Sequence, residues 1–96
     1  MARIGIFSKI GDDYNGVVQT IILSLSVEIK MLTSSATADY IVLNGLLEIG
    51  RGWRRSDRNE NSYISLKIDD LAFTSPIYAT LVKNELSGEY DLEWSR

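Results

Sequence analysis

The stretch that decides the fold is Tyr40-Ile41-Val42-Leu43-Asn44-Gly45-Leu46-Leu47-Glu48-Ile49. Two short apolar runs, each long enough for a strand, flank the central Asn44-Gly45 pair. Both central residues of a type I′ turn need a positive φ angle, which Asn and Gly tolerate better than other residues. This is the strongest hairpin signal in the chain, and it predicts two antiparallel strands joined by an Asn44-Gly45 two-residue turn.

Outward from this hairpin, apolar and polar residues alternate along much of the chain. Residues 21–29, 63–69 and 89–95 each place apolar side chains at every second position. A period of two is typical of a strand with one face against a core and the other face in water. The predicted core contains Leu23, Leu25, Val27, Ile64, Leu66, Ile68, Leu92 and Trp94.

Turn-forming residues separate these segments and complete the prediction. Residues 11–16 lie between a first strand and a long second one, and residues 57–62 and 87–88 mark two further turns. We expect an all-β fold, a single small antiparallel barrel or sandwich of about seven strands with at most one helical turn, at residues 70–75. At 96 residues the chain forms one domain, residues 1–96. The strands are predicted near residues 3–9, 16–30, 39–43, 46–55, 62–69, 76–83 and 89–95.

The composition argues against most familiar enzymes. The chain has no Cys and no His, which removes thiolate chemistry, the commonest general base and the commonest zinc ligand. The adjacent carboxylates Asp69 and Asp70 are not expected to hold a metal, because neighbouring strand residues point to opposite faces. We therefore expect a non-enzymatic protein with no catalytic residue, no cofactor and no metal.

The sequence predicts a cytoplasmic protein without membrane contact. The apolar run at the start of the chain is too short for the hydrophobic region of a signal peptide. The most apolar segment, residues 17–32, is interrupted by Gln19, Glu28, Lys30 and two serines, so it does not suit a membrane-spanning helix.

The charge distribution contains one local anomaly. The whole chain carries a net charge of −3, which argues against a protein that coats nucleic acid with its entire surface. Residues 51–60 nevertheless hold four arginines against Asp57 and Glu60, for a local charge of +2. An aromatic ring beside guanidinium groups suits single-stranded nucleic acid, because a base stacks on the ring while arginine pairs with phosphate. The candidate nucleic-acid-binding residues are Arg51, Trp53, Arg54, Arg55 and Arg58.

Other interpretations of this segment stay open at the level of sequence. Trp53 could pack in the core at a strand end, with the arginines solvating a hairpin loop, or the arginines could bind an acidic protein. The alternative to a nucleic-acid role is a protein-interaction or self-assembling β module, because short strands leave edges that pair with another chain. This reasoning makes a homodimer one of the expected partners, beside single-stranded nucleic acid and a protein partner.

A longer series of residues resembles a known family. Glu48-Ile49-Gly50, Trp53, residues 63–70, Phe73, residues 76–82 and the closing Trp94-Ser95-Arg96 together resemble an uncharacterised bacterial family catalogued as domain of unknown function 736. The resemblance covers nearly the whole chain. It implies a small protein encoded on plasmids and integrated elements, beside replication or transfer genes. It implies no activity, cofactor or ligand.

Overall fold

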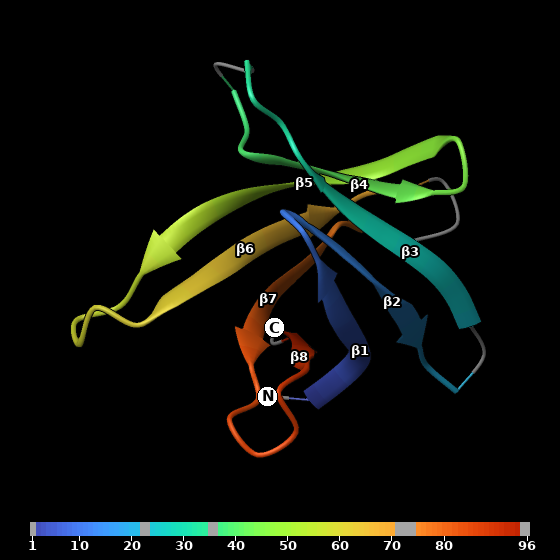
Figure 1. The fold of residues 1–96 in the computed structure, drawn as a ribbon. Coiled ribbons are helices and arrows are strands. Elements are labelled where there is room, and N and C mark those ends of the chain that lie inside the picture. Colours follow the sequence, from blue (N-terminus) through green and yellow to red (C-terminus); the bar gives the residue numbers. More distant parts are fainter. Residues whose placement is uncertain (1, 22–23, 35–36, 71–74, 95–96) are drawn as a thin grey trace.

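The computed structural model describes residues 2–21, 24–34, 37–70 and 75–94, and these form a closed β-barrel (Figure 1). Each strand pairs antiparallel with the next along the chain, and the first strand pairs with the last. The predicted all-β class is confirmed, and the fold is a barrel with eight strands in place of the expected seven or so. The strands are β1 (Ala2–Ile10), β2 (Asp13–Gln19), β3 (Ser24–Met31), β4 (Tyr40–Asn44), β5 (Leu47–Ser56), β6 (Ser62–Ile68), β7 (Ile77–Lys83) and β8 (Tyr90–Trp94).

The additional strand comes from a reversal inside the segment predicted as one long strand, residues 16–30. β2 ends at Gln19 and β3 begins at Ser24, with a fully exposed Ile21 between them. The apolar period of two continues through this reversal and no Gly, Pro or Asn marks it, so the alternation alone could not reveal the turn. The turn predicted at residues 11–16 is also shorter than expected, because β2 already begins at Asp13.

The central hairpin forms where it was predicted, but its turn lies one residue later. Asn44 pairs with Leu47, so the two turn residues are Gly45 and Leu46. Only Gly45 of these two has a positive φ, at 63°, a pattern that fits a type II′ turn better than the predicted type I′. The side-chain amide of Asn44 instead donates a 2.7 Å hydrogen bond to the Ser26 carbonyl, which holds β4 beside β3.

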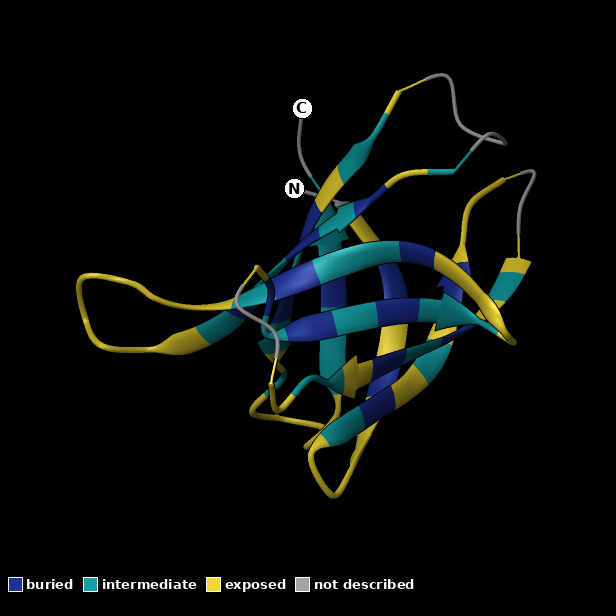
Figure 2. Cartoon of the chain, turned by 90° about the horizontal axis from the view of Figure 1, so that it is seen from above, coloured by how far each residue is buried: buried dark blue, intermediate teal, exposed yellow. Residues whose placement is uncertain are grey.

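The barrel interior is filled by apolar side chains from all eight strands. Figure 2 shows the resulting bands of buried and accessible residues along each strand. Of the predicted core, Val27, Ile64, Leu66, Ile68 and Leu92 are buried, Leu25 and Trp94 are half-buried against the core, and Leu23 lies outside the described residues.

The helical turn predicted at residues 70–75 falls mainly outside the described ranges. Across the part of the chain that the structure describes, no helix is long and apolar enough to cross a membrane.

Candidate nucleic-acid interface

The basic segment lies on a pair of strands that extends past the barrel wall. β5 and β6 pair from Gly50 opposite Ile68 to Ser56 opposite Ser62. The pairing of β5 with β4 ends at Gly52, and the pairing of β6 with β7 ends at Ile64. Residues 53–63 therefore form a two-stranded ribbon that projects from the barrel (Figure 1, at the left), and we call this ribbon the arm.

Alternation along β5 sets which of its residues point outward. Gly52 is buried and faces the interior, where an added Cβ would lie 2.5 Å from the Leu66 side chain. Arg51, Trp53 and Arg55 consequently share the outer surface, as the sequence indicated. The register adds residues of the neighbouring strands to this surface: Tyr63 opposite Arg55, Ser65 opposite Trp53, Lys67 opposite Arg51, and Tyr78 opposite Lys67. We call Arg51, Trp53, Arg55, Tyr63, Lys67 and Tyr78 together the outer face.

Trp53 is half-buried on the outer face and does not belong to the core. The alternative in which Trp53 packs inside the barrel is therefore wrong. Its indole N–H donates a 2.8 Å hydrogen bond to the Thr37 carbonyl in the segment between β3 and β4. The same segment receives Arg51, whose Nη1 lies 3.3 Å from the Thr37 hydroxyl. The bond to the Thr37 carbonyl fixes the orientation of the indole, and part of the ring stays accessible to solvent.

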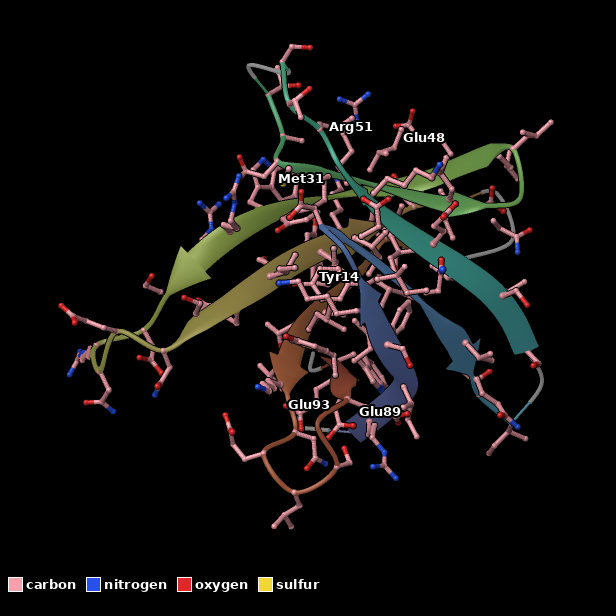
Figure 3. All side chains as sticks on the ribbon, in the orientation of Figure 1. Tyr14, Met31, Glu48, Arg51, Glu89 and Glu93 are labelled. Atoms are coloured by element: carbon pink, nitrogen blue, oxygen red, sulfur yellow. The ribbon has the colours of Figure 1, made fainter. Side chains whose placement is uncertain are left out.

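A shallow depression of about 320 Å³ lies beside Trp53 on the outer face. Its lining includes Arg51 and Lys67 together with the carboxylates of Glu48 and Asp69. Arg51 Nε contacts a Glu48 carboxylate oxygen at 3.0 Å, and Figure 3 shows these two side chains together on the outside of β5. The charge of Arg51 is therefore largely balanced within the protein.

Arg54 does not share the outer face, because the next residue of an alternating strand points to the opposite side. It pairs with Ile64, and its guanidinium lies over the ring of Tyr40, 5.8 Å from the centroid. The Arg54 backbone N–H donates to the Asp39 carboxylate at 2.9 Å, which takes the place of a β4 partner and ends the pairing there. The sequence grouped Arg54 with Trp53, and the structure separates them.

The ring beneath Arg54 belongs to a tyrosine cluster that closes this end of the barrel. Tyr14 meets Tyr40 and Tyr90 edge to face, with ring centroids 6.2 Å and 5.0 Å apart. Burial, reinforced by the neighbouring phenols, raises the pKa of Tyr14 to about 12. Burial raises the pKa of Tyr40 as well, and the nearby Arg54 charge partly opposes this rise. Both phenols therefore stay protonated at neutral pH.

Arg58 occupies the exposed loop at the tip of the arm, away from Trp53 (Figure 2, the yellow loop at the left). This loop is folded around Asp57, whose carboxylate accepts bonds from the Asn59 and Asn61 backbone N–H groups at 2.8 and 3.0 Å. Hydrogen bonds from Asn61 and Asn59 lower the pKa of Asp57. Within the described part of the chain, Arg55, Arg58 and Lys67 form no ion pair.

The structure adds three residues that the sequence argument missed. Lys67, Tyr63 and Tyr78 join the outer face only through strand register, since they lie on β6 and β7. Their alternation was visible, but nothing in the sequence said which β5 residue each would oppose. Among the described residues no group of three or more acidic, His or Cys side chains could hold a metal ion. What the outer face offers chemically is ring surface beside guanidinium and ammonium groups.

Comparison with known protein families matches residues 3–96 to the family described as "Protein of unknown function (DUF736)". The chain belongs to the DUF736 family. The resemblance drawn from Glu48-Ile49-Gly50, Trp53 and the later segments is thereby confirmed over the whole barrel. No curated protein and no solved structure matches this DUF736 chain.

Proposed function

We propose that this DUF736 protein is a non-enzymatic cytoplasmic accessory protein of plasmids or other mobile elements. In this proposal it binds single-stranded nucleic acid, alone or within a nucleoprotein, through the outer face. The observation that carries the proposal is the position of Trp53, which lies outside the core between Arg51 and Arg55 on one strand face. The link to mobile elements rests on the family resemblance alone.

In this proposal, aromatic residues stack on the bases and different, basic residues contact the phosphates. An unpaired base stacks on an accessible aromatic ring for about 1–3 kcal/mol, whichever base it is. Trp53 supplies such a ring, and Tyr63 and Tyr78 lie on the same face, Tyr78 with 60 % of its surface exposed. Because Glu48 already pairs with Arg51, we assign the phosphate contacts mainly to Arg55, Lys67 and Arg58.

The rest of the surface directs nucleic acid to this one face. Outside residues 51–60 the chain has a net charge of −5, so most of the barrel repels phosphate. Binding is then local, and a small number of substitutions removes it. A protein that bound nucleic acid through a diffuse basic surface would instead lose affinity gradually.

The experiment is a titration of a labelled single-stranded oligonucleotide at several salt concentrations. For three contacts, the logarithm of the binding constant should fall with the logarithm of the salt concentration with a slope of about −2, at roughly 0.7 for each phosphate on a single strand. The double variant Arg55→Gln, Lys67→Gln should bind much more weakly, and the magnitude of its slope should decrease by about 1.4. Trp53→Ala should weaken binding by about 1–3 kcal/mol without changing the slope, because stacking releases no counterions.

Arg3→Gln is the matched control, since it removes one positive charge four strands around the barrel from β5. It should leave the slope and the affinity nearly unchanged. Circular dichroism must show that each variant is folded. Absence of binding at low salt and micromolar protein, or an equal loss in Arg3→Gln, would refute the proposal.

The competing proposal is a protein-interaction or self-assembling module, and exposed apolar residues favour it. Ile21, Leu46 and Leu47 lie in or beside turns at the same end of the barrel, and Ile21 and Leu46 are fully exposed. Closure of the barrel removes the free sheet edges that suggested a homodimer from sequence, except along the arm, so these exposed side chains are now the main support for the module. Sedimentation velocity of the protein and of Leu46→Ser distinguishes the two: a dimer that the substitution dissociates favours the module.

A further inference from the structure

The arm has the dimensions of a groove-binding element. From Trp53 to the loop at Asp57 it extends four residues past the barrel wall, about 13 Å at 3.3 Å per residue. It consists of two strands only, since neither β4 nor β7 pairs with it. The major groove of duplex DNA, about 12 Å wide, admits a two-stranded ribbon of this kind.

Positive charge is spread along the arm. Arg54 lies at its base on one face, Arg55 on the other face, and Arg58 at its tip. The carboxylate of Asp57 is turned into the loop, where three hydrogen bonds from Asn59 and Asn61 occupy its oxygens. The Arg54 guanidinium lies over the Tyr40 ring at the base of the arm, so Arg55 on the outer face and Arg58 at the tip are the arginines placed toward the phosphates of a groove.

The base of the arm adjoins the stacking surface. Trp53 is the first residue beyond the last β4 pair, so the ring and the arm meet at the barrel wall. A single strand that stacks on Trp53 therefore enters or leaves beside the element that suits a duplex groove. We infer that the preferred ligand is a junction between duplex and single-stranded nucleic acid, with the unpaired strand on the outer face and the duplex around the arm. This inference rests on the proposed function and names its substrate class.

The test compares three probes under identical salt. One is a single strand, the second a blunt duplex of roughly 20 base pairs, about two helical turns. The third is the same duplex with a single-stranded overhang of about ten nucleotides, within the usual site size of one binding domain. The intact protein should bind the junction at least about tenfold more tightly than either other probe, because two linked contacts act together.

A shortened arm identifies the cause of any preference. Residues 56–62 are replaced by Asn-Gly, a two-residue turn that closes the pair of Arg55 with Tyr63 and removes the loop together with the last strand pair of the arm. This variant keeps every residue of the outer face and loses one positive and two negative charges. Charge alone would therefore strengthen its binding to all three probes. Insertion of the arm predicts the opposite for the junction: its preference falls to about twofold or less. Binding of the single strand should lose only the Arg58 contact, which reduces the steepness of its salt dependence by about 0.7.

The outcomes separate this inference from the proposal beneath it. Binding of the single strand with no preference for the junction overturns the inference and leaves the proposed function standing. Equal binding of blunt duplex and junction also overturns it, since the unpaired strand would then contribute nothing. If the variant with the shortened arm still prefers the junction, the preference comes from another part of the protein and the role of the arm is refuted. Failure to bind any probe overturns both.

Discussion

At the scale of single residues, one glycine of the barrel lies against an aromatic ring of the neighbouring strand. Gly16 lies directly opposite Phe7 in the β1–β2 pair, and Phe7 is completely buried. A Cβ at position 16 would lie 2.6 Å from the Phe7 ring and would also collide with the Ile6 carbonyl oxygen. The ring of Phe7 covers the space that a side chain at Gly16 would occupy, an arrangement known to stabilise glycine within strands.

Gly16→Ala should therefore destabilise the protein by about 1–3 kcal/mol, because backbone and ring must both move to admit one methyl group. Urea unfolding followed by circular dichroism measures this change. Ser26→Ala is a suitable control on the adjacent strand, where an exposed side chain should change stability by less than about 0.5 kcal/mol. A Gly16→Ala variant as stable as Ser26→Ala would show that β1 and β2 can separate at no cost.

The same glycine shows where reasoning from sequence fails at this scale. The sequence places Gly16 at a boundary, as the last residue of the predicted turn 11–16 and the first of the predicted strand 16–30, because Gly and Asn are typical of turns. In the barrel it is a strand residue required by a neighbour nine positions earlier in the sequence. A glycine selected for close approach and a glycine selected for a turn look alike until the pairing is known.

At the scale of elements, the arm contains the one non-glycine residue with a positive φ in the described ranges. Glu60 has a φ of 63° in the loop between β5 and β6. A left-handed backbone costs roughly 1–2 kcal/mol for a residue with a Cβ, whereas glycine adopts it freely at some cost in unfolded-state entropy. The loop thus keeps a strained residue at the tip of an exposed ribbon.

Glu60→Gly should stabilise the protein by about 0.5–1 kcal/mol, because relief of this strain exceeds the entropy that glycine adds to the unfolded chain. Thermal or urea unfolding provides the measurement. Asn59→Gly is the matched control, since its φ is not positive and glycine there brings only the entropic cost. If the two variants change the free energy of unfolding equally, the backbone conformation of Glu60 does not reduce the stability of the protein.

The sequence predicted which residues of a strand face inward and which face outward, but it did not predict which residues lie opposite one another on neighbouring strands. Alternation placed Ile64, Leu66 and Ile68 inside and correctly grouped Arg51, Trp53 and Arg55 outside. Alternation could not place Lys67 or Tyr78 beside Trp53, because the residues that face each other on different strands depend on where the turns lie. The hairpin turn predicted at Asn44-Gly45 lies one residue later, and an error of one residue in a register changes every cross-strand neighbour.

At the scale of the whole molecule, closure could not be read from the sequence. Both a barrel and a sandwich satisfy alternating strands with short connections. The feature that decides between them is the pairing of β1 with β8, between residues more than eighty positions apart. Local patterns carry no information about such a pair. The argument for a homodimer through a free edge failed to anticipate closure for the same reason.

Closure has a consequence for chain connectivity. Every strand of the barrel pairs through backbone hydrogen bonds only with its two neighbours, so the order of strands is a ring, and Ala2 already lies opposite Trp94. A ring of sequential strands has one long-range pairing wherever it is opened. A circular permutant with a short linker between residues 94 and 2, and new ends between Leu86 and Ser87, exchanges the β1–β8 pairing for β7–β8.

The mean sequence separation of contacts is then nearly unchanged, and folding rates of small proteins follow that quantity. Stopped-flow refolding should show the permutant folding within a few-fold of the parent chain, with the same far-ultraviolet spectrum. A permutant that refolds orders of magnitude more slowly would instead identify the β7–β8 hairpin as the place where the ring begins to form.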